Sequence, residues 1–487
     1  MNRLARLSML VFAVVVAGIS FGFALVRADE LPADTNKIKS LTPEQARKLA
    51  AEFPGVEAEV EIKGYGKVYY DNCLPLNGLK SLDTEAARAL AGYGKGPLLL
   101  NGLNTLDADV AKAFKGARLL LSGLTELDAD VAKSLAECKG WLNLSGLTTL
   151  DASAAKALAE FKGEYVWLNG LTSLDADAAK AIAEFNGKYL YLDGLTSLDA
   201  DTAKALAEFN GRLSLNGLPT FSLDAAKALA EFKANTLSLN GLITLDADTA
   251  KALAEFKGKY LYLSALPTLD ADTAEALAES AAWGGSLPGL TTLDADTAKA
   301  LAGSKEWSLS LGGLTTLNAN TAKALAKFKG RRLYLDGLTS LDVDTAKALA
   351  EFKGKSLSLD GLTTLDADTA KALAEFKGDD LSLSGLTTLC LGAATALAAA
   401  EKWDGWLRRI TALDSPDSVA IAKALATRKG PLKLPTLKKI SPRTLTALLK
   451  KEDVEIPLSE TLELIPEPDG IPTEDFIIPE GFEQRSR

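Results

Sequence analysis

The chain has 487 residues, of which 47% are hydrophobic and 24% are charged, so it can bury a sizeable core. Its net charge of −10 argues against general nucleic-acid binding, which requires a basic surface. The absence of histidine excludes Ser-His-Asp and Cys-His catalysis, imidazole metal sites and histidine pH switches.

Residues 1–28 have the composition of a targeting segment rather than of a folded element. Arg3 and Arg6 precede an uncharged apolar run over residues 9–26. The run is long for a signal peptide and just long enough to span a bilayer, so a cleaved signal and an uncleaved anchor both stay open. Either one predicts export of residues 29–487 to a secreted, periplasmic or cell-surface location, with membrane contact only through such an anchor.

Residues 29–72 are predicted to form an N-terminal capping region. Thr42, Pro43 and Gln45 supply an N-cap, a proline at the first helical position and a capping box. Alternating apolar and acidic residues over 56–62, followed by a Gly-rich turn, predict a β-hairpin after that helix. A solenoid needs such a polar-faced end to cover its last apolar layer.

One phrase recurs through residues 73–450 about every 24 residues, with shorter spacings of 21 and 23, and is clearest as LYLDGLTSLDADTAKALAEF at 190–209. Its opening Leu-Tyr-Leu alternates as a short strand with both leucines buried. The Gly that follows suits a turn with positive φ. Asp199 then caps a helix that ends at Phe209. The array of such units predicts a solenoid rather than several separate domains.

The pattern of Leu-x-Leu, Leu-x-x-Leu and a helix resembles the leucine-rich repeat family over roughly residues 40–450. The resemblance implies a right-handed α/β solenoid with short parallel strands on the concave face and helices on the convex face. One departure is the missing asparagine ladder, because Leu195 and its equivalents stand where the family carries Asn. Asp193, Asn216 and Asn240 are therefore expected to satisfy the turns in a different way.

An Asp-x-Asp pair recurs at the start of most predicted helices, as at Asp199 and Asp201. A row of carboxylates raises the hypothesis of calcium binding, whereas an N-cap followed by an acidic first turn explains the same pattern structurally. Asn318 and Asn320 replace one pair, which favours capping. The three cysteines show no disulfide, nucleophile or metal spacing, and Cys138 occupies a position where other copies have a core Phe. We therefore predict no metal and no cofactor.

The strand positions that the repeat leaves free are the candidate ligand contacts. Aromatic residues and arginine concentrate there, as in recognition surfaces, although cross-strand stabilisation of an exposed sheet is an alternative explanation. The candidate binding residues are Trp141, Asn143, Tyr165, Trp167, Tyr189, Tyr191, Arg212, Tyr260, Tyr262, Arg332 and Tyr334.

Two stretches depart from the repeat. Residues 280–285 interrupt one copy, which indicates a bend, a weak seam or a decayed unit. Residues 451–487 are acidic and proline-rich, and are predicted to form an extended C-terminal tail.

These features favour an exported, non-catalytic binding protein that recognises a protein or glycan through its concave face. The alternative is a structural or assembly element of the cell envelope without a specific soluble ligand. An enzyme is disfavoured, because the carboxylates are repetitive and no Gly-rich phosphate loop or metal cluster is evident.

Overall fold

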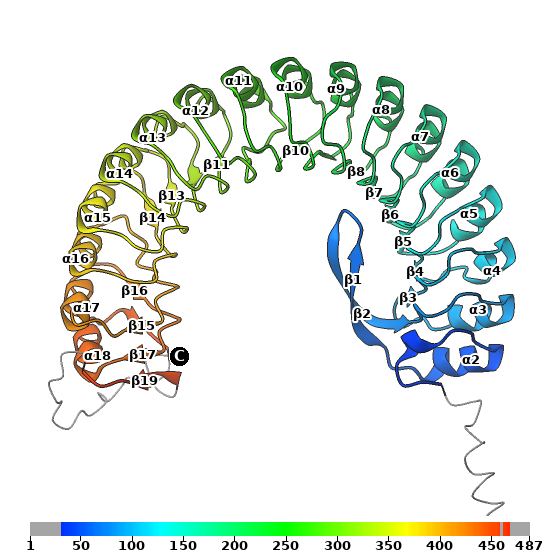
Figure 1. Ribbon diagram of the computed structural model, residues 1–487, viewed down its shortest axis with the longest axis horizontal. Helices are drawn as coiled ribbons and strands as arrows, with labels where there is room; N and C mark the ends of the chain where they lie inside the picture. Colours follow the sequence, from blue (N-terminus) through cyan, green and yellow to red (C-terminus); the bar gives the residue numbers. More distant parts are fainter. Residues whose placement is uncertain (1–30, 458–460, 468–487) are drawn as a thin grey trace, which may run out of the picture. The chain divides into compact units, whose positions relative to one another are not determined.

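The computed structural model describes residues 31–457 and 461–467, in which strands and helices alternate along the chain (Figure 1). The predicted targeting segment and most of the predicted tail lie outside these residues. The chain divides into two compact units. The first runs up to Leu171 and includes Phe185–Gly187, and the second comprises Thr172–Glu184 and the chain from Lys188 onward.

The first unit begins with a short 3₁₀ helix, a helix and a hairpin, and then alternates helices with short strands. Its elements are η1 (Thr35–Lys37), α2 (Pro43–Glu52), β1 (Val56–Ile62), β2 (Gly66–Pro75), α3 (Thr84–Ala91), β3 (Leu98–Leu99), α4 (Ala108–Ala113), β4 (Leu119–Leu120), α5 (Ala129–Leu135), β5 (Trp141–Asn143), α6 (Ala152–Ala159) and β6 (Tyr165–Trp167).

The second unit continues the alternation. Its helices are α7 (Ala176–Ala183), α8 (Ala200–Leu206), α9 (Leu223–Ala230), α10 (Ala247–Ala254), α11 (Ala271–Glu279), α12 (Ala295–Ala302), α13 (Ala319–Leu325), α14 (Val343–Ala350), α15 (Ala367–Ala374), α16 (Leu391–Ala399), α17 (Ser418–Ala426) and α18 (Pro442–Leu449). Its strands are β7 (Tyr189–Tyr191), β8 (Arg212–Ser214), β9 (Thr236–Ser238), β10 (Tyr260–Tyr262), β11 (Ser308–Ser310), β12 (Arg332–Tyr334), β13 (Ser356–Ser358), β14 (Asp380–Ser382), β15 (Ala412–Leu413), β16 (Leu432–Lys433), β17 (Lys439–Ile440), β18 (Val454–Glu455) and β19 (Glu463–Leu464).

Within each unit the strands form one row and the helices another, and neighbouring strands pair in parallel one repeat apart, as Leu213 pairs with Leu237. Strands lie about 4.8 Å apart whereas helices are about 10 Å wide, so stacking both rows in register places the strands on the concave side. The core lies between the rows, where the strand leucines Leu190 and Leu192 are fully buried. This arrangement confirms the predicted α/β solenoid.

The helices begin where the repeat places its first aspartate. Asp199 accepts a hydrogen bond from the backbone N–H of Thr202, at 2.8 Å, and so caps α8. The Thr202 hydroxyl is buried and donates to the carbonyl of Leu174 in the preceding copy, at 3.3 Å. The helix ends at Leu206, three residues earlier than predicted, and both Leu206 and Phe209 are buried.

The second residue after each of the strands β7 to β9 takes part in a hydrogen-bonded ladder from copy to copy. Asp193 accepts from the backbone N–H of Asn216 at 2.9 Å. The Asn216 side chain accepts from the N–H of Asn240 at 2.8 Å, and Asn240 accepts from the N–H of Ser264 at 2.9 Å. These residues therefore satisfy the turns from another position than the usual ladder asparagine, as expected from the sequence.

The glycine after each ladder residue is required for a different reason from the predicted one. Positive φ was expected there, but Gly217 has no positive φ. A Cβ atom built on Gly217 would lie 2.1 Å from the carbonyl oxygen of Asp193 in the preceding copy. The glycine is thus needed because two backbones approach closely, not because the turn is left-handed.

The described residues also include the predicted capping box, the buried Cys138, the irregular copy and the start of the tail segment. Thr42 and Gln45 form the expected capping box at α2, and Cys138 is buried in the core. In the irregular copy, Trp283 makes only an isolated bridge to Leu261 and is almost fully buried. Beyond residue 450, β18 pairs in parallel with β16, and β19 with β17, so the first part of the tail segment adds strands to the array. No helix among the described residues is long and apolar enough to cross a membrane.

Candidate binding surfaces on the strand faces

Four adjacent strands of the second unit, β7 to β10, bring together half of the predicted aromatic residues. Their register aligns Tyr189, Arg212, Thr236 and Tyr260 in one row across the sheet. The second row consists of Tyr191, Ser214, Ser238 and Tyr262. Two tyrosine pairs therefore flank two strands that carry small polar residues and Arg212.

Each tyrosine pair is stacked. The rings of Tyr189 and Tyr191 are 6.2 Å apart with an interplanar angle of 4°, and those of Tyr260 and Tyr262 are 6.5 Å apart at 17°. Tyr260 and Tyr262 are 38% and 43% exposed, whereas Tyr191 is only 8% exposed. We call Tyr189, Tyr191, Arg212, Tyr260 and Tyr262 the tyrosine surface.

Two cations lie against this surface. The guanidinium carbon of Arg212 is 5.2 Å from the ring centre of Tyr189, and the Lys259 ammonium is 5.0 Å from that of Tyr260. Cation–π contacts at these distances hold long side chains over the rings. They give the surface exposed positive charge beside flat apolar faces.

The small residues between the tyrosine pairs are held by the ladder. Ser238 donates its hydroxyl to the Asn216 side chain at 2.8 Å, and the Asn240 amide donates back to Ser238 at 3.0 Å. Ser214 donates to Asp193, whose pKa is raised because burial penalises its charged form. The centre of the surface is therefore a fixed polar strip rather than a set of free rotors.

In the first unit the predicted aromatic residues are covered by the hairpin β1–β2, which lies on the strand side (Figure 1). The Tyr70 ring lies 5.2 Å from that of Trp141, and the Tyr65 ring lies 6.4 Å from that of Trp167. Ile62 at the end of β1 is fully buried. Trp167 is consequently only 4% exposed.

Polar contacts reinforce this cover but leave some groups unsatisfied. Asn169 donates its side-chain amide to the carbonyl of Lys63 at 2.6 Å. Asn143 is fully buried. Its side-chain oxygen Oδ1 accepts from the Ser145 N–H, but its Nδ2 has no hydrogen-bond partner in the described structure. The hydroxyl of Tyr70 is likewise buried without a partner there. Such groups cost free energy, so the hairpin contact is weaker than its aromatic area alone suggests.

The remaining predicted residues fall in different places. Tyr165 is half-buried and stacks on Trp167, with ring centres 5.6 Å apart. Arg332 and Tyr334 lie on β12, where their neighbours on β11 and β13 are serines. The candidate residues thus form a covered cluster in the first unit, the tyrosine surface in the second, and an isolated pair on β12.

Two features of the structure were not predicted from the sequence. The hairpin was expected only to cap the end of the array, because nothing in its local pattern indicates which strands it contacts. The carboxyl of Asp404, in the loop after α16, was not singled out; burial raises its pKa to about 6, and the nearby charges of Asp380 and Asp360 add to that effect. A Trp-Asp-Gly-Trp break in the repeat at 403–406 was the available signal.

The repeated aspartates cap most of the helices they precede, whereas Asp107 makes no side-chain hydrogen bond at the start of α4. Asp246 accepts from the N–H and the hydroxyl of Thr249 at 2.8 and 3.0 Å, and Asn318 caps α13 in the same way by accepting from the Thr321 N–H at 3.0 Å. Across residues 31–457 and 461–467, no group of three or more Cys, Asp or Glu side chains is arranged to hold a metal ion.

The repeated Leu-x-Leu strands, the parallel pairing at one-repeat intervals and the polar ladder together define a leucine-rich-repeat solenoid. The chain thus has a leucine-rich-repeat architecture, with the ladder displaced to the second residue after the strand.

Comparison with known proteins finds distant likenesses among solved structures. No family model and no curated protein matches the chain. A leucine-rich-repeat protein of Leptospira interrogans is similar at 18% identity, covering 86% of this chain and 98% of that one, with a TM-score of 0.39. The Toll chain of the Drosophila Toll–Spatzle complex matches at 14% identity, 78% and 54% coverage and a TM-score of 0.45. An internalin of Listeria monocytogenes matches at 15% identity, 76% and 93% coverage and a TM-score of 0.32.

Proposed function

We propose that this protein is an exported, non-catalytic binding protein that holds a protein or glycan ligand on its strand face, at the tyrosine surface. The observation that carries the proposal is the presence of two stacked tyrosine pairs, of which Tyr260 and Tyr262 are well exposed, on either side of Arg212 and a fixed serine strip. Three strand spacings separate the pairs, which is about 14 Å at about 4.8 Å per strand.

The chemistry of this surface suits recognition. Tyrosine offers a large rigid face and a hydroxyl at a small cost in conformational entropy, and serine adds adaptable hydrogen bonds. Arg212 adds a charge over one tyrosine ring. An exposed aromatic patch with a polar centre is more typical of a binding site than of bare sheet stabilisation.

Export is proposed from the apolar run at residues 9–26, which either a cleaved signal or an anchor would explain. A structural or assembly element of the envelope is the alternative. Light scattering coupled to size exclusion distinguishes the two, since a stable monomer of residues 29–487 favours ligand binding and concentration-dependent polymers favour assembly.

The direct test is a pull-down from the source envelope with residues 29–487, in parallel with a Tyr260→Ser/Tyr262→Ser variant. Lys251→Ser, on helix α10 of the preceding repeat, is the matched control because it leaves the strand face intact. We expect one species to be captured by the wild type and the control, and lost with the double variant. Equal capture by all three proteins would contradict the proposed surface.

A further inference from the structure

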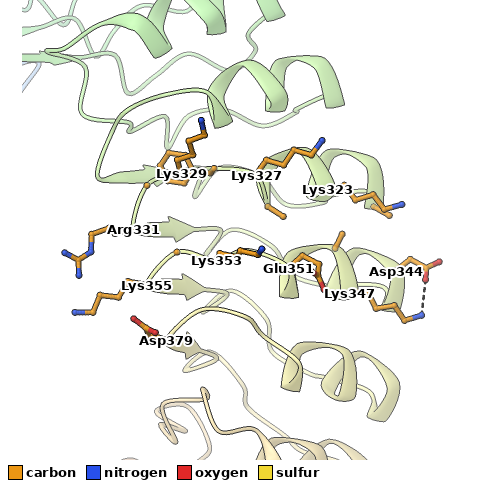
Figure 2. A pocket seen from close by; sticks show the side chains of 16 residues that line it. Lys323, Lys327, Lys329, Arg331, Asp344, Lys347, Glu351, Lys353, Lys355 and Asp379 are labelled. Atoms are coloured by element: carbon orange, nitrogen blue, oxygen red, sulfur yellow. Dashed lines mark hydrogen bonds and ion pairs between the residues drawn. The ribbon is translucent and has the colours of Figure 1, made fainter.

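A basic groove lies between two consecutive copies of the second unit, beside α13 and α14 and the loops that lead to β12 and β13 (Figure 2). Its volume is about 1350 Å³. Six lysines and Arg331 line it, against three carboxylates, although the chain as a whole has a net charge of −10. We call this set the basic groove.

The basic groove lies where two copies lack a Glu that forms ion pairs elsewhere in the array. At two other places, a Glu at the end of one helix pairs with the Lys two residues after the equivalent position in the next copy. Lys257 pairs with Glu231 in this way, and Lys162 pairs with Glu137 at 3.3 Å. Nine copies carry this Glu, at Glu137, Glu160, Glu184, Glu208, Glu231, Glu255, Glu279, Glu351 and Glu375.

Two successive copies between Glu279 and Glu351 depart from that rule. The Glu position holds Gly303 in one copy and Lys327 in the next. Lys329 therefore has Gly303 where it would need a Glu partner in the preceding copy. Lys353 has Lys327 at the equivalent position, which is a second positive charge instead of a carboxylate. The result is uncompensated positive charge on exposed side chains.

An exposed aromatic residue adjoins the groove on the side where the strands begin. Trp307 is 56% exposed, and the guanidinium of Arg331 stacks on it at 4.3 Å from the ring centre. In Figure 2 Arg331 and Lys355 extend together from this side, whereas Lys323 and Lys347 lie along the helices. The groove thus leads from a flat aromatic platform to a row of ammonium groups.

We propose that the basic groove binds an acidic polysaccharide, whose carboxylate or sulfate groups contact the lysines and whose sugar ring packs on Trp307. An apolar sugar-ring face matches an exposed indole, and spaced anions match ammonium groups that act as separate point charges. Phosphate recognition by paired oxygens more often employs several arginine forks, and this groove has one. The site is separate from the tyrosine surface and does not depend on it.

Isothermal titration of residues 29–487 with heparin and with polygalacturonate, at low and physiological salt, tests the proposal. Lys327→Glu is the informative variant, because it restores the residue that most copies carry and should leave the fold intact. Lys251→Glu makes the same charge change on the outer face of α10, outside the groove. Trp307→Lys places at this position the residue found at Lys188 and Lys259 in other copies.

We expect at least one of the two polysaccharides to bind, with an affinity at least tenfold lower in Lys327→Glu and unchanged in Lys251→Glu. Binding should alter tryptophan fluorescence in the wild type, and this change should be largely lost in Trp307→Lys. Failure of both polysaccharides to bind, or equal weakening by both lysine variants, would overturn the proposal. Binding of polyphosphate or of anionic phosphatidylserine vesicles in place of the polysaccharides would also overturn it.

Discussion

The side-chain amide of Asn169 donates to the carbonyl of Lys63 at 2.6 Å, which joins the turn of the hairpin to the strand side of a repeat 106 residues further along the chain. Around this bond, Tyr65 contacts Trp167 and Tyr70 contacts Trp141. The contact covers residues that the repeat pattern alone would leave open to a ligand.

Replacing Asn169 by Ala should loosen the hairpin without unfolding the repeats. Loss of one hydrogen bond of this kind costs about 1 kcal/mol, and the buried, unpartnered Tyr70 hydroxyl already weakens the contact. We expect faster amide hydrogen exchange in residues 56–75 and little change in α8 to α18. Unchanged exchange in the hairpin would show that aromatic packing alone holds it.

Replacing Asn216 by Ala should destabilise the second unit. The side-chain oxygen of Asn216 accepts from the Asn240 N–H and the Ser238 hydroxyl, and its side-chain Nδ2 donates to Ser214. Leaving such groups unpaired costs about 1–3 kcal/mol. Chemical denaturation should detect this loss, while Asn210→Ala, on an exposed loop of the preceding copy, should stay within about 0.5 kcal/mol of the wild type. Equal effects of the two changes would contradict a stabilising ladder.

Replacing Asp246 by Ala and by Asn separates capping from calcium binding. The Ala variant loses the cap and should be destabilised by about 1 kcal/mol, whereas Asn should be nearly neutral, as Asn318 caps α13. Thermal melting should be the same with and without EDTA. A lower melting temperature in EDTA would instead indicate that the aspartate row holds calcium.

Replacing Asp404 by Asn should stabilise the protein above about pH 6. The pKa of this carboxyl is raised to about 6 in the folded chain, so the folded state retains a proton that the unfolded chain releases near its ordinary pKa of 3.8. The cost of ionising Asp404 therefore grows as the pH rises through this window and is fully present above it. Asn removes the charge and can keep the contact with the Trp406 N–H.

The expected observation is a higher melting temperature for Asp404→Asn at pH 7.5, with a difference that shrinks towards pH 4.5. The exposed Asp414→Asn change is the control and should show no such pH dependence. A stabilisation that is equal at both pH values would rule out the raised pKa as its cause.

The repeat unit could be predicted from sequence because its signals are local. Alternating leucines specify the strand and Asp199 specifies the helix start, whereas the helix ends at Leu206 rather than at the predicted Phe209. The role of Gly217 was misassigned, since its constraint comes from the carbonyl of Asp193 one copy earlier rather than from its own turn. Interactions between copies therefore cannot be predicted from the sequence of a single repeat.

The candidate sites also differ in whether they follow from the repeat or from distant contacts. The register of β7 to β10 follows from the repeat, so the alignment of Tyr189 with Tyr260 was accessible from sequence. The burial of Trp167 was not, because it depends on a hairpin more than 90 residues away. The sequence shows Lys327 at a position where most copies have Glu. That this change leaves nearby lysines without an ion-pair partner can be inferred only from the Glu–Lys pairs in the structure.

The hairpin contact also constrains how many repeats can lie between the hairpin and Asn169. Outside the hairpin, the ladder hydrogen bonds reach one unit forward, so whole units could be duplicated or lost there without changing the local bonds. The bond between Asn169 and Lys63 instead spans β3, β4 and β5, and it can form only when those units are present in that number. Variation in array length is therefore expected beyond β6, with the count before it held constant.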